Sequence, residues 1–134
     1  MIDRLSHASI YVLDQERAKT FYTEKLGFEV RMDVTMGNFR WLTVGPPGQP
    51  ELQIVLMPVQ GSPMQGESKA SLRTLVQSGE LGMGVFATRD CRKTYAELKA
   101  KGVEFKSEPE ERPYGVEATF VDDSGNVFSL TQPK

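Results

Sequence analysis

A chain of 134 residues, of which 39% are hydrophobic, is long enough for one domain or for two small half-domains that share a core. Its formal charge of -2 argues against nucleic acid or an anionic membrane as a partner. The single cysteine, Cys91, precludes an internal disulfide, and no signal peptide or apolar run of about 20 residues is evident. We therefore expect a cytoplasmic protein that binds a small molecule.

One order of patterns occurs twice along the chain. Residues 5–28 read as a strand, an aspartate, an amphipathic helix and a glycine, and residues 81–105 repeat this order. Asp14 and Asp90 take the N-cap positions of the two helices, where a carboxylate accepts hydrogen bonds from free backbone N–H groups. The repeat predicts two similar modules that face each other around a shared hollow.

Each module is predicted to hold four strands and one helix. In the first module the opening strand is followed by strands near 28–34, 38–44 and 51–57, and in the second module by strands near 103–107, 116–121 and 127–131. The DDSGN segment at 122–126 predicts a tight turn. We place the first module at residues 1–58, a connector at 59–80 and the second module at 81–134. Within the connector, Ser68 is expected to cap a short helix that ends at Gly79.

Four segments of this chain resemble one known superfamily: SHASIYVLD, TFYTEKLGF, YAELKAKGVEF and FVDDSGNVFSL. They are similar to the vicinal oxygen chelate superfamily of glyoxalases, bleomycin-resistance proteins, extradiol dioxygenases and fosfomycin-resistance enzymes. The resemblance covers nearly the whole chain and implies an α+β fold in which two βαβββ modules pair into a cupped mixed sheet. It also implies a homodimer, and metal ligands on the first and last strand of each module in the catalytic members. The reaction does not follow from the fold, because the family includes enzymes as well as proteins that only sequester a ligand.

At the family's metal positions this chain carries weak donors. His7 and Gln53 stand at the first module's positions, Met83 (or Gly82) and Ser129 at those of the second. A catalytic zinc site needs three protein ligands, and non-haem iron needs two histidines with a carboxylate, whereas the chain has one histidine. No cofactor is expected; a divalent ion, if bound, would use His7 and Gln53. Glu117 could add a carboxylate if its side of the strand faces inward.

The remaining candidates predict a site with soft, apolar walls. Trp41 can stack on a flat or cationic ligand, although plain core packing explains it as well, and Tyr114 lies in a loop that contacts substrate in relatives. Cys91 is expected to be a core residue. The residues predicted to contact the ligand are His7, Tyr11, Trp41, Gln53, Met57, Met83, Tyr114 and Ser129.

Three functions remain open at this point. The first is a binding protein for an apolar or aromatic small molecule, without a complete metal site. The second is a metal-dependent lyase or isomerase of glyoxalase type. The third is a metal-free acid–base enzyme, because the one histidine, His7, could act as a general base near neutral pH. A purely structural, hydrogen-bonded His7 is the alternative to any of these roles.

Overall fold

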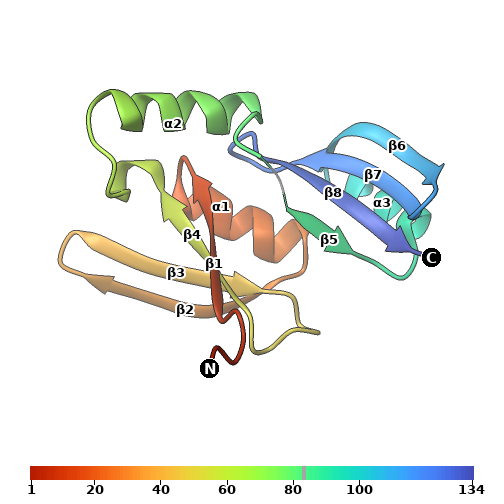
Figure 1. Cartoon of the computed structure of the whole chain (residues 1–134), viewed down its shortest axis with the longest axis horizontal. Helices are drawn as coiled ribbons and strands as arrows, with labels where there is room; N and C mark the ends of the chain where they lie inside the picture. Colours follow the sequence, from red (N-terminus) through yellow and green to blue (C-terminus); the bar gives the residue numbers. More distant parts are fainter. Residues whose placement is uncertain (83) are drawn as a thin grey trace. The chain divides into compact units, whose positions relative to one another are not determined.

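The computed structural model describes residues 1–82 and 84–134, in two units, Met1–Arg73 and Thr74–Lys134. Each unit contains a four-stranded sheet with a helix on one face, which confirms the predicted α+β class and the two βαβββ modules (Figure 1). The hollow expected between the modules stays a prediction. In the described part of the chain, no helix is long and apolar enough to cross a membrane.

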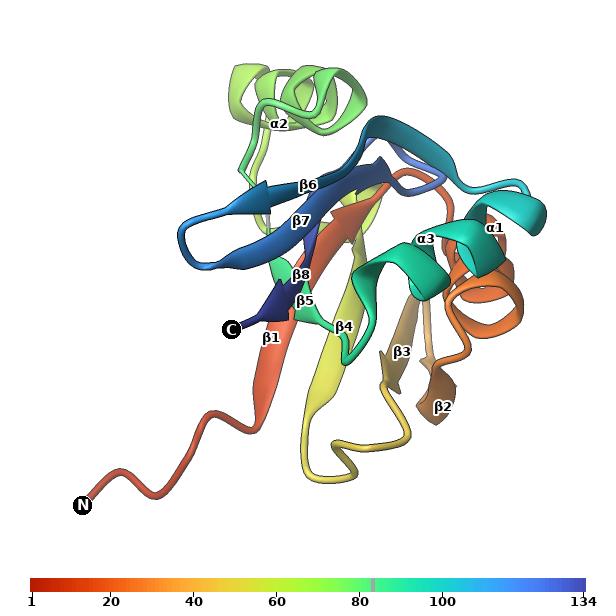
Figure 2. The same ribbon diagram turned by 90° about the vertical axis from the view of Figure 1, so that its right-hand side faces the viewer.

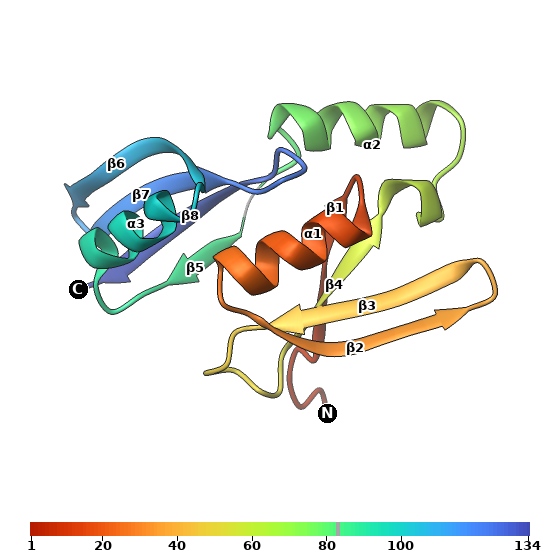
Figure 3. The same cartoon turned by 180° about the vertical axis from the view of Figure 1, so that it is seen from behind.

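The first module follows the predicted order closely. Its elements are β1 (His7–Val12), α1 (Gln15–Thr20), the π-helical turn η1 (Phe21–Lys25), β2 (Glu29–Met36), β3 (Phe39–Gly45), β4 (Gln53–Pro58) and the short 3-10 turn η2 (Val59–Gly61). The strands lie in the order β1-β4-β3-β2, with β1 parallel to β4 and the other pairs antiparallel. Figure 3 shows α1 on one face of this sheet.

The second module repeats this arrangement. It contains β5 (Val85–Ala87), α3 (Cys91–Ala100), β6 (Glu104–Arg112), β7 (Gly115–Val121) and β8 (Val127–Pro133), in the sheet order β5-β8-β7-β6. Strands β5 and β8 are parallel, as β1 and β4 are in the first module. Helix α3 lies on one face of the sheet (Figure 2).

The local signals read from the repeat produce these helices. Asp14 accepts a hydrogen bond from the Arg17 backbone N–H, and Asp90 accepts one from the Lys93 N–H, so both aspartates are N-caps as predicted. After the C-terminal end of α3, Gly102 has φ +91°, in the left-handed region that ends helices. The ends of these helices are therefore marked by residues close to them in the sequence.

The aliphatic side of each sheet packs on its helix. In the first module the buried side chains Leu42 and Leu56 lie on the same side as α1, whose Ala18 is also fully buried. In the second, the thiol of Cys91 lies 3.5 Å from the Leu130 carbonyl oxygen. Burial raises the pKa of that thiol, which is typical of a small core residue and not of a nucleophile.

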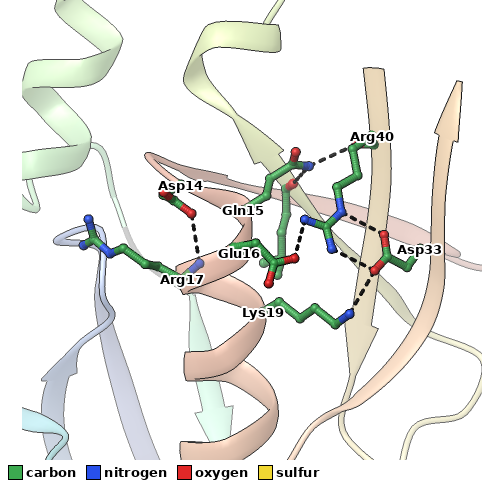
Figure 4. Close-up of polar contacts among 8 residues, drawn as sticks. Asp14, Gln15, Glu16, Arg17, Lys19, Asp33 and Arg40 are labelled. Atoms are coloured by element: carbon green, nitrogen blue, oxygen red, sulfur yellow. Dashed lines mark hydrogen bonds and ion pairs between the residues drawn. The ribbon is translucent and has the colours of Figure 1, made fainter. Parts of the chain in front are cut away.

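Ion pairs hold α1 against the neighbouring strands β2 and β3 (Figure 4). Asp33 of β2 accepts two hydrogen bonds of 2.8 Å from the Arg40 guanidinium and one of 3.0 Å from Lys19 of α1. Arg40 also pairs with Glu16 at 2.7 Å. The hydrogen bond from Arg40, followed by that from Lys19, holds the pKa of the Asp33 carboxyl far below its usual range. This network ties α1 to strands β2 and β3.

Two expectations need correction. Helix α2 spans Glu67–Ser78, so Ser68 is a helical residue and not the cap. Gly66, just before the helix, has φ +59°, and its carbonyl accepts a hydrogen bond from the Ala70 N–H. Strand β6 continues beyond the predicted end at residue 107 to Arg112. It is an edge strand, and an edge strand tolerates Pro109, which has no backbone N–H to donate to a neighbouring strand.

Candidate functional site

The face of the first sheet that is turned away from α1, which we call the distal face, gathers most of the predicted ligand contacts. Residues directly opposite each other on neighbouring strands share a face, and the pairs His7 with Gln53 and Tyr11 with Met57 place these four together. Side chains alternate along each strand, and the distal face therefore contains His7, Ser9, Tyr11, Met32, Val34, Met36, Phe39, Trp41, Thr43, Gln53, Val55 and Met57.

Three rings lie in a row on the distal face. The centroids of His7 and Trp41 are 6.0 Å apart and those of Trp41 and Phe39 are 6.4 Å apart, both tilted. Beside them, on the edge strand β2, Met32, Val34 and Met36 expose 43%, 42% and 59% of their surface. Apolar side chains grouped at this exposure are typical of a binding surface.

One hydrogen bond orients the only carboxamide of this face. The Thr43 hydroxyl donates to Oε1 of Gln53 at 2.8 Å, and Thr43 itself is fully buried. No hydrogen bond within the described part of the chain uses the Gln53 Nε2 group. On the same edge of the face, the Nδ1 atom of His7 lies 2.9 Å from the Ser6 hydroxyl. Gln53 therefore lies next to His7, the first ring of the row.

The second module has a polar counterpart on the sheet face turned away from α3. Ser129, only 2% exposed, donates to Oε2 of Glu117 at 2.6 Å, and the Tyr114 hydroxyl donates to Oε1 at 2.6 Å. A further contact of 2.7 Å joins the hydroxyls of Ser129 and Thr131. The hydrogen bond from Ser129, then that from Tyr114, lowers the pKa of Glu117, while the bond to Glu117 raises that of Tyr114. The carboxyl group is thus kept ionised.

The predicted ligand contacts therefore fall into two sets. Five of them, His7, Tyr11, Trp41, Gln53 and Met57, share the distal face of the first sheet. In the second sheet, Ser129 and Tyr114 meet through Glu117, and Met83 lies outside the described residues.

Sequence reasoning missed some of the residues of the distal face. Neither Thr43 nor the apolar residues of β2 are among the predicted ligand contacts. The alternation in EVRMDVTM was the available signal, because every second residue from Met32 to Met36 is apolar while Asp33 points to the helix side.

The donor set does not fit a divalent ion. Among residues 1–82 and 84–134, no group of three histidine, cysteine, aspartate or glutamate side chains is placed to hold one. The strand registers add a second argument. Ser9 and Val85 each lie five residues before the aspartate that caps the helix of their module. Ser9 pairs with Val55 in the first module, and Val85 pairs with Ser129 in the second. The first-module equivalent of Ser129 is therefore Val55, which has no donor atom, and not Gln53.

The chain belongs to the Glyoxalase/Bleomycin resistance protein/Dioxygenase superfamily, whose family model matches residues 4–130. This match confirms the resemblance drawn from the sequence motifs.

Three relatives illustrate the similarity. The crystal structure of UcmS2 is 53% identical, with a TM-score of 0.92 over 98% of each chain. TnmS3, an antibiotic binding protein from Streptomyces sp. CB03234, is 33% identical, with a TM-score of 0.78 over 99% of this chain and 98% of its own. The uncharacterized protein YetH of Bacillus subtilis is 36% identical over 98% of this chain and all of its own.

Proposed function

We propose that the protein binds a small molecule with a flat, apolar ring system on the distal face of the first sheet, and that no metal ion takes part. The ring row of His7, Trp41 and Phe39 carries this proposal. Aromatic side chains combine a large apolar area with few rotatable bonds, so they bind flat molecules at a small cost in conformational entropy. The exposed methionine side chains beside them adapt to the outline of such a ligand.

Similarity to TnmS3 supports a binding role over catalysis. That protein is an antibiotic binding protein, and it shares a third of its residues with this chain over nearly the full length. Sequestration needs shape and apolar area only, whereas the lyase alternative needs a divalent ion to polarise a substrate oxygen. The weak donor set described above favours sequestration.

Binding can be measured with 2-ethylnaphthalene as a flat, apolar probe. Trp41 is the sole tryptophan of the chain, so its fluorescence reports directly on the ring row. We expect saturable binding in a calorimetric titration, together with a saturable change in Trp41 emission. Trp41→Leu should weaken binding about tenfold, on the scale of one aromatic contact. Tyr95→Leu, which changes an aromatic residue of α3 in the other module, is the matched control and should bind as the wild type does. Equal affinity of both variants would contradict the proposal.

Metal content distinguishes the lyase alternative. The purified chain should bind Zn²⁺, Ni²⁺ and Mn²⁺ no more tightly than its His7→Ala variant. A stoichiometric ion that the His7→Ala change abolishes would instead establish a metal enzyme that uses His7 and Gln53.

The acid–base alternative depends on His7 alone. It requires turnover of some substrate with a dependence on pH that His7→Ala removes. The His7→Gln variant should retain probe binding under the binding proposal, because the ring row keeps Trp41 and Phe39.

We further propose that the protein is a homodimer, as the family resemblance implies. Light scattering of the purified chain should give twice the monomer mass of 15.0 kDa. A mass of one chain across the working concentration range would refute this.

A further inference from the structure

We infer that the ligand carries a carbonyl or similar hydrogen-bond acceptor next to its ring system, and that Gln53, oriented by Thr43, is the residue that recognises it. This inference rests on the proposed function, since it names the class of ligand that the same face selects. The observation behind it is the direction of one hydrogen bond, from the Thr43 hydroxyl to Oε1 of Gln53.

Burial of Thr43 decides that direction. Thr43 is fully buried, and Oε1 of Gln53 is its only side-chain hydrogen-bond partner among the residues that the structure describes. If the carboxamide were turned over, Nε2 would donate to the threonine oxygen, and the buried hydroxyl hydrogen would lose its acceptor. A buried donor without an acceptor costs free energy, so the observed orientation is the stable one.

The fixed carboxamide turns its two N–H donors away from Thr43. Gln53 is half-buried, and no described residue accepts a hydrogen bond from its Nε2. Gln53 also lies directly opposite His7, the first ring of the row, on the neighbouring strand. An acceptor on the rim of a flat ligand that covers the rings is therefore within reach of these donors.

The chemistry of Gln53 favours a neutral acceptor over a charged group. A carboxamide has no net charge. The guanidinium beside it, that of Arg31 over Gly45, already donates to the Glu29 carboxylate and to the Pro46 and Gln49 carbonyl oxygens. A ketone, amide or quinone oxygen accepts one or both N–H groups without the cost of burying a charge. The face as a whole is thus suited to a flat, neutral, carbonyl-bearing ring system.

The test compares two probes of nearly equal shape, 2-acetylnaphthalene, which has a carbonyl group, and 2-ethylnaphthalene, which has none. In calorimetric titrations we expect the wild type to prefer the carbonyl probe about three- to tenfold, the net effect of one hydrogen bond. Gln53→Leu should remove the preference by weakening only the carbonyl probe. Thr43→Val keeps the shape of the buried side chain and leaves Gln53 in place, and it should reduce the preference because the carboxamide is no longer held.

The outcomes separate this inference from the proposed function. Equal binding of both probes by the wild type, or an unchanged preference in Gln53→Leu, overturns the inference and leaves the binding of flat apolar molecules intact. Failure of both probes to bind the wild type refutes both. Circular dichroism and thermal unfolding of each variant establish that it is folded, and Ser9→Ala, on the same face but without a ring or carboxamide contact, serves as the matched control. A Ser9→Ala variant that loses the preference as Gln53→Leu does would also overturn the inference.

Discussion

Removal of the Ser129 hydroxyl should destabilise the second module, and it should do so most where Glu117 is ionised. The hydroxyl donates to the carboxylate at 2.6 Å from a site that is 2% exposed. A hydrogen bond to a charged group contributes about 1.5–3 kcal/mol. Since Glu117 is only half-buried and partly hydrated, we expect Ser129→Ala to lower the free energy of unfolding by about 1–2 kcal/mol at pH 7.

The dependence on pH follows from the lowered pKa of Glu117. Its ordinary value is 4.5, and the folded chain holds it below that value, so the stabilising contribution is present above pH 4.5 and is lost as the pH falls through the folded-state pKa. The deficit of Ser129→Ala relative to the wild type should therefore shrink on acidification.

Urea unfolding followed by circular dichroism at pH 7 and at several acidic pH values measures this deficit. Tyr114→Phe is the matched control, because it removes the other hydrogen bond to Glu117 from a residue that is 53% exposed, and it should cost less. If the loss of unfolding free energy in Ser129→Ala stays constant with pH, the role given to the ionised carboxylate is refuted. The absence of any loss at pH 7 would refute it as well.

Two further predictions concern the stability of the two modules. Asp33→Asn removes the ion pairs to Arg40 and should lower the free energy of unfolding by about 1 kcal/mol in urea titrations at low salt. At 1 M salt the screening length is about 3 Å, so the loss should be smaller there. A loss of the same size at both salt concentrations would contradict an electrostatic cause. Gly115→Ala should cost about 2 kcal/mol or more in melting experiments, because φ is +144° and the new Cβ would lie 2.0 Å from the Gln132 carbonyl oxygen. Gly48→Ala, with no atom within 4 Å, should cost little, and equal losses would contradict the steric argument.

The sequence by itself determined the elements and their order. An aspartate before each helix, a glycine after it and apolar residues at alternate strand positions act within a few residues of each other, so the repeat is readable without tertiary contacts. The same alternation places Trp41 and Arg40 on opposite faces of their strand. Helix α2 was located less well, because it starts at Glu67, one residue before the predicted cap Ser68.

Tertiary structure decided which residues meet. Strand register makes Val55, and not Gln53, the first-module equivalent of Ser129, and no local pattern encodes register between strands far apart in the chain. The partners of Gln53 and Glu117 likewise come from neighbouring strands, Thr43 from β3 and Ser129 from β8. A hydrogen bond that orients a side chain depends on distances of a few tenths of an ångström, and only the packed sheet fixes those.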